Sequence, residues 1–550
     1  MKLRPLRILP IALVFAGCAQ YATVSEVRPR FRPVRTAIRV LASGGDRIEV
    51  AMREERRDPQ RALGELLTVA EAAWSELERN PNDTAARDEY NFAVARVFGI
   101  LRNSHLEPWS QPVHVPAAGG EFLLTWQRDP RPQWNPAIYL FTPADQFDVG
   151  GTYVDKEVRK EGVGAPLVAM GRENYANADK DFTTTRIFYG VTGLIHFQGR
   201  RAVIGFEDPL ATELVRLDGR TFPLAADFTV PLAVMLKTMN PKKQELTRLL
   251  RPGNYAETAR IARLQPYDPN KTVVLVIHGL MDSPATWTPM INHLRADEKI
   301  RRNYQFWFYS YPSGYPYPYS AAILRHELDA IEKRFPMRKK MVVIGHSMGG
   351  CISRLLLTDT GDKLWMDLFK KPPGEVAMTP EHRKMFEDAL IFRHRPEVGR
   401  VIFISAPLRG SNMAKQWTGR IGSMLVRAPR LLLKAGAEIV KHVTFEPDEL
   451  KLKRIPNSVD TLAPNNRFVK AINTIPITPG IPYHVICGDR GKGGNKDQTK
   501  PEMSDGIVPY WSSHMEGARS ELIVPSNHSA HQNKQAIDEV QRILDEYATR

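Results

Sequence analysis

The run MVVIGHSMGGCISRLL, residues 341–356, constrains this chain most, because it sets a short glycine-flanked motif between two different apolar patterns. The apolar residues 341–344 predict a buried strand, and the apolar positions after Gly350 predict a helix packed on a sheet. Between them, residues 345–349 have the Gly-x-Ser-x-Gly spacing of a nucleophile elbow. A turn this tight strains the backbone and lifts the serine hydroxyl clear of the sheet edge. The motif therefore predicts Ser347 as a nucleophile, against the alternative of an ordinary glycine-rich turn.

The start of the chain predicts an export signal. Basic residues precede the apolar stretch 8–16, which is too short to stay in a bilayer as a spanning helix, so residues 1–17 are expected to be a signal peptide. The small residues before Cys18 resemble a bacterial lipobox, in which the cysteine is acylated and becomes the mature N-terminus. This resemblance implies a lipid-anchored envelope protein, and Ala19 after the cysteine implies the outer membrane, facing the periplasm. The alternative is an ordinary secretory signal cut near Ala19.

Composition restricts the partners. The formal charge is +15, but the basic residues are scattered among acidic ones and form no arginine-rich tracts with stacking aromatics. We therefore expect no nucleic-acid binding, whereas the excess of positive charge favours attraction to an anionic envelope surface. The other two cysteines, Cys351 and Cys487, are expected to be core thiols. No His-x-x-x-His helix, Cys-x-x-Cys pair or phosphate-binding glycine loop is present, so the sequence predicts neither a metal nor a cofactor.

The pattern along the chain predicts several regions. Residues 18–57 are polar and rich in arginine, which favours a tether. Residues 58–112 show two amphipathic helical segments around a turn, which predict a helical hairpin. Residues 113–235 are short strand-like runs between Gly, Pro and Asp, typical of a β-rich accessory module. Residues 236–270 are a polar connector. From residue 271 strands and helices alternate, which predicts a mainly parallel sheet with helices on both faces.

Residues 271–550 resemble the α/β-hydrolase superfamily, specifically bacterial lipases and carboxylesterases. The resemblance depends on five features, which are His278-Gly279 after the first strand, the elbow at 345–349, Pro407-x-x-Gly410-Ser411, the turn Asp505-Gly506-Ile507-Val508-Pro509, and a late histidine. It implies an α/β-hydrolase domain, in which the apolar and basic segment at about 412–475 would be a cap or lid insertion. No family resemblance is evident for residues 19–235.

A serine nucleophile needs an imidazole base, and two histidines near the end of the chain compete for that role. His528 lies near the centre of the loop between a predicted strand and the last helix, where lipase-like folds place the base. His531 lies nearer the start of that helix, which suits a capping or supporting role. We therefore favour His528.

The acid that orients the base has two candidates. Asp505 opens the turn that resembles the acid-bearing turn of lipases, and the order Ser, acid, His is that of this fold. Asp489 directly follows a predicted strand, which also suits an acid by topology, although an aspartate there can simply cap the turn. We favour Asp505.

An acyl transfer also needs two N–H donors for the oxyanion. The elbow supplies the backbone N–H of Met348, the residue after the nucleophile. By resemblance to lipases with a His-Gly turn, the second donor is the N–H of Leu280. His278 is then expected to brace that turn rather than to act as a base.

These features together predict a serine hydrolase that cleaves carboxylic esters, with an ester or lipid as substrate and the membrane as partner through the lipidated N-terminus. Two alternatives stay open. The domain could be an inactive binding or assembly scaffold of the envelope, or the same residues could serve an acyltransferase or a thioesterase. The oligomeric state, the natural substrate and the acyl length are not predicted.

Overall fold

The computed structural model describes residues 21–549 except 32–41, 105, 129–134, 155, 172–187, 218, 240–244, 246–247, 250, 255–258, 413–456 and 492. The expected signal peptide, Cys18 and most of the expected lid segment lie outside these residues.

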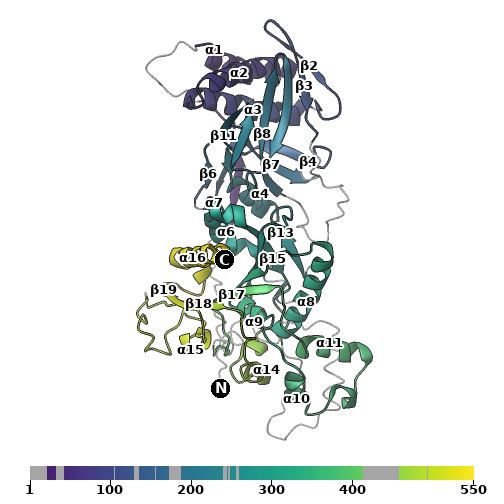
Figure 1. The fold of residues 1–550 in the computed structure, drawn as a ribbon, viewed down its shortest axis with the longest axis vertical. Helices are drawn as coiled ribbons and strands as arrows, with labels where there is room; N and C mark the ends of the chain where they lie inside the picture. The colour runs from purple at the N-terminus through teal and green to yellow at the C-terminus, as the bar shows by residue number, and fades with distance from the viewer. Residues whose placement is uncertain are drawn as a thin grey trace, which may run out of the picture.

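The N-terminal region consists of helices packed against a six-stranded sheet (Figure 1). The strand order is β2-β3-β9-β8-β7-β4, and only the β3–β9 pair is parallel. The elements are α1 (Ala42–Glu54), α2 (Pro59–Arg79), α3 (Thr84–Ser104), β2 (Val113–Ala117), β3 (Gly120–Trp126), β4 (Tyr139–Pro143), β7 (Ala165–Gly171), β8 (Phe188–Gln198) and β9 (Arg201–Glu207).

Helices and sheet of this region share one hydrophobic core. Trp74 on α2 contacts Tyr90 on α3 and also Phe222, which lies beyond the sheet in the chain. The hydroxyl of Tyr90 donates to the carbonyl oxygen of Ile195 on β8, at 2.8 Å. The two segments that the sequence separated, 58–112 and 113–235, therefore pack as a single unit, because neither buries its apolar face alone.

The tether expected at residues 18–57 contains folded structure. The strand β1 (Thr23–Glu26) pairs antiparallel with β5 (Phe147–Gly150), and Ala22 is buried. The helix α1 packs against α2. The expectation of a simple tether was wrong here, because the partner of β1 lies far along the chain and a four-residue strand has no pattern of its own.

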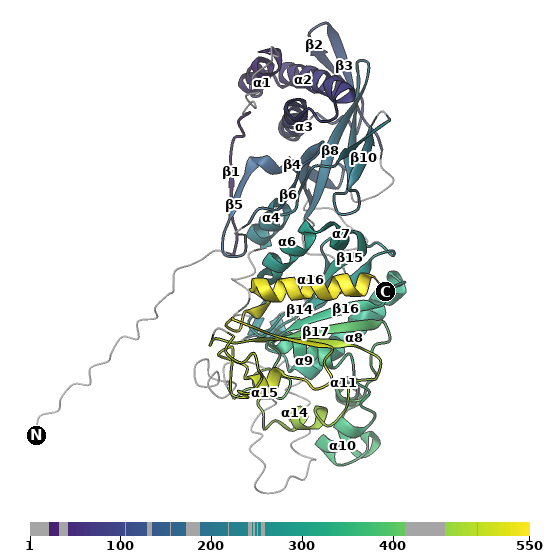
Figure 2. The same ribbon diagram turned by 60° about the vertical axis from the view of Figure 1, so that its left-hand side comes forward.

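The C-terminal region is built on a seven-stranded sheet of order β13-β15-β14-β16-β17-β18-β19, parallel except for β13 (Figure 2). Helices α6, α7 and α16 cover one face, and α8 and α9 cover the other. The expected α/β fold is confirmed. The bounds are β13 (Arg260–Arg263), β14 (Thr272–Ile277), α6 (Thr288–Ala296), α7 (Glu298–Asn303), β15 (Tyr304–Ser310), α8 (Tyr317–Arg334), β16 (Met341–His346), α9 (Met348–Arg354), β17 (Val398–Ile404), β18 (Tyr483–Gly488), β19 (Ser520–Val524) and α16 (Lys534–Ala548).

The connector expected at 236–270 is not only a connector. It contains the strand β13, which joins the edge of the seven-stranded sheet and pairs with residues 307–310 of β15. A boundary at 271 therefore comes too late, because an antiparallel edge strand of four residues carries little periodicity. Of the lid segment expected at 412–475, the described part holds the short helices η9 (Asp460–Leu462) and α14 (Arg467–Ile472).

Shorter elements complete the described chain. They are β6 (Arg159–Lys160), β10 (Leu214–Leu217), β11 (Arg220–Pro223), β12 (Ala226–Asp227), α4 (Val230–Met239), α10 (Lys363–Phe369), α11 (Pro380–Leu390), α15 (Tyr510–Ser513) and the one-turn helices η2 (Ala144–Gln146), η5 (Pro284–Trp287), η6 (Pro373–Glu375) and η10 (Ala530–Gln532).

Polar contacts join the two regions. Arg301 on α7 makes a two-pronged ion pair with Glu213, with N–O distances of 2.6 and 2.9 Å. The hydroxyl of Thr229 donates to the side-chain oxygen of Asn292 on α6, at 3.0 Å. Both pairs are largely buried, so the regions are held together by specific contacts.

The beginning of the described chain also reaches the C-terminal region. The hydroxyl of Tyr21 donates to Glu245, at 2.5 Å, and the other oxygen of that carboxylate accepts from the hydroxyl of Ser283, at 2.6 Å. Ser283 lies in the turn after β14.

Two further observations bear on the sequence predictions. Cys351 and Cys487 are buried free thiols, as expected. Across the described part of the chain, the helices are too short or too polar to cross a membrane.

Candidate active site

The elbow forms a sharp turn between β16 and α9. Ser347 has φ +53° and ψ −126°, a backbone conformation that a residue with a side chain rarely adopts. A Cβ atom on Gly345 would lie 2.5 Å from the carbonyl oxygen of Gly349, and one on Gly349 would lie 2.2 Å from the carbonyl oxygen of Ile277. The glycines are therefore required by close backbone packing, as the motif predicts.

The structure brings Ser347, His528 and Asp505 into one hydrogen-bonded chain. Ser347 Oγ lies 2.8 Å from His528 Nε2, and His528 Nδ1 lies 2.8 Å from Asp505 Oδ2. The other carboxylate oxygen of Asp505 accepts the backbone N–H groups of Ile507 and Val508, both at 2.8 Å. This is the arrangement of a nucleophile, a base and an orienting acid.

The charge of Asp505 is stabilised within the turn that carries it. Burial alone would raise the pKa of this carboxyl, but His528 and the two backbone N–H donors outweigh burial, so its pKa is lowered. A carboxylate that stays ionised can hold the imidazole in one orientation and stabilise its protonated form.

The two competing residues lie elsewhere. His531 is buried in η10, where its Nε2 lies 3.1 Å from the hydroxyl of Thr286 and its ring packs on Trp287. Of the two roles considered for His531, capping belongs to Asn533 instead, which caps α16. Asp489 accepts the N–H of Gly491 at 2.7 Å, which is the turn-capping alternative considered for it.

The turn after β14 lies directly against the nucleophile. A Cβ atom on Gly279 would lie 2.9 Å from the Cβ of Ser347, so only glycine fits there. The next residue is Leu280, and within the described residues neither its N–H nor that of Met348 donates a hydrogen bond. Both groups are thus available to an oxyanion beside Ser347.

His278 braces this turn. Its Nδ1 lies 2.9 Å from the carbonyl oxygen of Gly279, and its ring stacks on Tyr311, whose hydroxyl donates to the carbonyl oxygen of His278 at 2.8 Å. Burial lowers the pKa of His278 to about 4, so its ring is neutral near pH 7. Met281 in the same turn has φ +53°, and its N–H donates to the hydroxyl of Ser313 at 3.2 Å.

A second polar group, which the sequence analysis missed, lies behind Ser347 and His528. His346, the variable position of the elbow motif, has its Nε2 2.7 Å from the carbonyl oxygen of His528. Its Nδ1 lies 3.5 Å from Oδ2 of Asp282, and its ring packs against that of His531 with centroids 4.1 Å apart. Burial would raise the pKa of Asp282, but the neighbouring histidines, His346 foremost, lower it. The available sequence signals were that His346 directly precedes Ser347 and that Asp282 lies in the turn that begins at His278.

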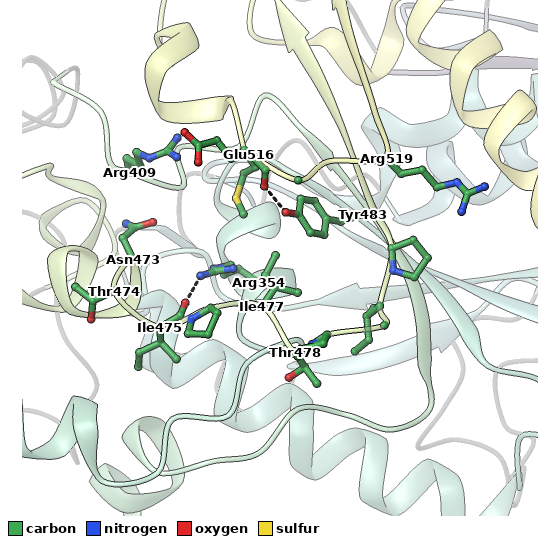
Figure 3. A pocket seen from close by; sticks show the side chains of 17 residues that line it. Arg354, Arg409, Asn473, Thr474, Ile475, Ile477, Thr478, Tyr483, Glu516 and Arg519 are labelled. Carbon is green, nitrogen blue, oxygen red and sulfur yellow. Dashed lines mark hydrogen bonds between the residues drawn. The ribbon is translucent and has the colours of Figure 1, made fainter.

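A separate cavity of about 870 Å³ opens at the other end of the sheet (Figure 3). It lies beside Tyr483, the first residue of β18, whereas the acid and base loops follow the last residues of β18 and β19. The guanidinium of Arg354 donates to the carbonyl oxygen of Ile475 in its wall. None of Ser347, Asp505 and His528 lines this cavity, so it lies apart from their hydrogen-bonded chain.

Comparison with known families agrees with this geometry. The model of the Alpha/beta hydrolase family matches residues 273–540, so this part of the chain belongs to the alpha/beta hydrolase family. The match spans the elbow and both of the loops that carry Asp505 and His528. No curated protein matches the sequence.

Several solved structures are similar over about half of this chain. A lipase from Bacillus licheniformis in its mature form is 17% identical over 52% of this chain and 97% of its own, with a TM-score of 0.31. A lipase from Staphylococcus hyicus is 14% identical over 52% and 98%, with a TM-score of 0.32. A lipase-esterase related protein from Clostridium acetobutylicum is 13% identical over 52% and 98%, with a TM-score of 0.29.

Proposed function

We propose that the protein is a serine hydrolase that cleaves carboxylic esters through an acyl-enzyme, with Ser347 as nucleophile, His528 as base and Asp505 as orienting acid. One observation carries the proposal, namely the continuous hydrogen bonding from Ser347 Oγ through both nitrogens of His528 to Asp505, built on a strained elbow. A scaffold has no need of this arrangement, and the strain at Ser347 has a cost that only a positioned hydroxyl explains.

The reaction follows from the positions of these atoms. As Ser347 Oγ attacks the ester carbonyl, His528 Nε2 takes its proton, and the charge of Asp505 stabilises the imidazolium. The carbonyl oxygen becomes an oxyanion, which the N–H groups of Met348 and Leu280 would hold. His528 then gives its proton to the leaving alcohol. A water molecule, activated by the same imidazole, releases the acid and restores Ser347.

The location belongs to the same proposal. Acylation of Cys18 would hold the enzyme at the envelope membrane, where lipid esters are available as substrates. The support is the short apolar stretch that ends in small residues before Cys18. We expect wild-type protein to incorporate labelled palmitate and to fractionate with membranes, and Cys18→Ala to lose both properties. A soluble wild-type protein without label would favour the ordinary secretory signal instead.

The decisive test uses Ser347→Ala beside wild type. We expect a fluorophosphonate probe to label wild type and not the variant, and p-nitrophenyl esters of increasing chain length to be hydrolysed only by wild type. Ser353→Ala is a matched control, because this serine lies on α9 and its hydroxyl bonds to the carbonyl oxygen of Gly349. Turnover by a folded Ser347→Ala protein would contradict the proposal.

The alternatives are separated by the products. If the acyl group goes to an added alcohol in preference to water, the triad serves an acyltransferase. If a thioester is turned over faster than the matching oxygen ester, the enzyme is a thioesterase. If wild type neither labels nor turns over any ester, the domain is an inactive scaffold.

A further inference from the structure

We propose that Asp282, His346 and His531 bind a divalent transition-metal ion of the zinc class. One possible ligand atom from each residue lies within 4.8 Å of those of the other two. Both histidine side chains are buried, with 5% and 2% of their surfaces exposed, and the carboxylate of Asp282 is only 10% exposed. The site goes beyond the proposed ester hydrolysis, which needs no metal.

The donor atoms are spaced for a shared ion. His346 Nδ1 lies 3.5 Å from Asp282 Oδ2. Two ligands that each bind zinc tetrahedrally, at about 2.0–2.2 Å, lie roughly 3.3–3.5 Å from each other. The third ligand would come from His531, whose ring packs against that of His346.

Two buried nitrogen atoms have no hydrogen-bond partner within the described residues. They are Nδ1 of His346 and Nδ1 of His531, and both lie in rings whose other nitrogen is already engaged. Buried polar atoms are nearly always paired, because desolvation without a partner is costly. Two such atoms on neighbouring rings beside a carboxylate indicate a shared ligand that takes lone pairs.

The remaining contacts of the three residues match the surroundings of a bound metal. A metal-bound histidine usually donates its other N–H to a carbonyl or another oxygen. His346 Nε2 lies 2.7 Å from the carbonyl oxygen of His528. His531 Nε2 lies 3.1 Å from the hydroxyl of Thr286 and 3.3 Å from the side-chain amide of Gln532. Asp282 Oδ1 accepts the N–H of Ser283 at 2.7 Å, and Oδ2 accepts the N–H of Gly279 at the longer distance of 3.4 Å. A carboxylate oxygen has more than one lone pair, so Oδ2 can still bind the ion.

An arrangement without a metal accounts for only one of the two unpaired nitrogen atoms. Without an ion, Nδ1 of His346 would face Oδ2 of Asp282 directly, at the 3.5 Å separation that the structure has. That arrangement leaves Nδ1 of the buried His531 without a partner within the described residues. Two imidazoles and one carboxylate suit zinc and similar ions, whereas magnesium and calcium prefer oxygen ligands.

The ion would hold the active site together without taking part in the reaction. Asp282 follows β14 in the turn that carries Leu280, His346 precedes the nucleophile, and His531 lies in the loop that carries the base. One ion would therefore tie together the three segments that carry the oxyanion donor, Ser347 and His528. Through the contact of His346 with the carbonyl oxygen of His528, it would fix the position of the base.

The experiment uses the full-length protein without a polyhistidine tag. Metal content is measured by mass spectrometry as purified, and zinc and cobalt(II) are titrated into protein treated with a chelator. We expect close to one zinc per chain and visible absorption bands of tetrahedral cobalt. His531→Gln should weaken zinc binding by more than about 100-fold, because changing even an outer contact of a metal ligand costs 10–100-fold.

The matched control is His484→Gln. His484 is also fully buried, but it lies on β18 and contacts Arg400 and Ser520 instead of the cluster. This variant should bind zinc as wild type does. A chelator should also lower the melting temperature of wild type and of His484→Gln, but not that of His531→Gln.

The inference is wrong if folded wild-type protein contains no metal and the chelated protein binds neither zinc nor cobalt. The same result would favour a direct contact between His346 and Asp282. Labelling of Ser347 by the fluorophosphonate probe is measured in the same samples. Labelled protein without metal binding overturns only the metal site, and metal binding without labelling overturns only the proposed function.

Discussion

The two sheets of the molecule differ in how they bury their strands. In the C-terminal sheet every residue of β14 and β16 is buried, because helices cover both faces. In the N-terminal sheet β9 alternates between buried and partly exposed residues, and one face packs on the hairpin of α2 and α3. A strand buried on both faces has little room for polar groups along its length, so reactive side chains come at its end.

This difference in burial matches a difference between the two regions in where their polar side chains lie. The carboxyl ends of parallel strands meet at one edge of a sheet, and there the C-terminal region brings Ser347, Asp505 and His528 together. In the N-terminal region, by contrast, a charged group such as Glu213 forms an ion pair with the C-terminal region, here with Arg301. We therefore expect substitutions at the strand ends to change turnover, and substitutions at the contact between regions to change stability.

The largest expected effect is at the base. His528→Ala should lower kcat on a short p-nitrophenyl ester by about 10⁴-fold or more, because triad members act as a unit. His531→Ala should cost less, since this residue does not contact Ser347. Thermal melts of both variants exclude unfolding. A larger loss at His531 would reassign the base.

The second largest loss of kcat is expected at the acid, Asp505. Asp505→Asn should lower kcat by about 10³–10⁴-fold, because asparagine keeps the shape but removes the charge that stabilises the imidazolium. Asp489→Asn is the matched control, as this carboxylate accepts a turn N–H and should affect stability more than turnover. The assignment fails if the two variants lose kcat in the reverse order.

The contact between regions gives a smaller effect, on stability. Glu213→Gln should lower the free energy of unfolding by about 2–3 kcal/mol at pH 7, because it leaves the buried Arg301 without its charged partner. The value of kcat should stay near that of wild type. Chemical denaturation at several pH values measures the difference, and a large loss of turnover in folded protein would contradict the separation of roles.

The stability difference between wild type and Glu213→Gln should depend on pH. Burial alone would raise the pKa of Glu213, but hydrogen bonds from Arg301 and Lys160 outweigh it, so the pKa is lowered from 4.5. A lowered carboxyl pKa contributes stability that is present above the unfolded value and is lost as the pH falls through the folded value. The stability difference between wild type and Glu213→Gln should therefore narrow below about pH 4.5 and not at alkaline pH.

The smallest expected effect is at Thr229, whose hydroxyl donates to Asn292 and accepts the N–H of Val158 at 2.7 Å. Thr229→Val keeps the shape but leaves these groups unpaired, and it should cost about 1–2 kcal/mol of unfolding free energy. Turnover should not change. A cost below experimental error would show that this contact is not needed to join the regions.

Local patterns and the resemblance to lipases predicted three residues that the structure brings together. The glycine spacing around Ser347 and the loops of Asp505 and His528 lie next to the strands that position them, so short segments were informative. The group of Asp282, His346 and His531 was missed because its members come from three distant loops and none forms a spaced motif. The strands β1 and β13 were missed for a related reason, since both are four residues long and pair with distant partners.

The hydrogen bonds from Tyr21 and from Ser283 to Glu245 place Tyr21 near the turn after β14. If Cys18 is acylated as proposed, at most about 11 Å of extended chain separates Cys18 from Tyr21. The turn that carries Leu280 would then be held close to the membrane surface by this short segment. The enzyme would then reach lipid esters by lateral diffusion within the membrane. Lengthening the segment between residues 18 and 21 would slow the turnover of esters in vesicles, whereas the turnover of water-soluble esters would stay the same.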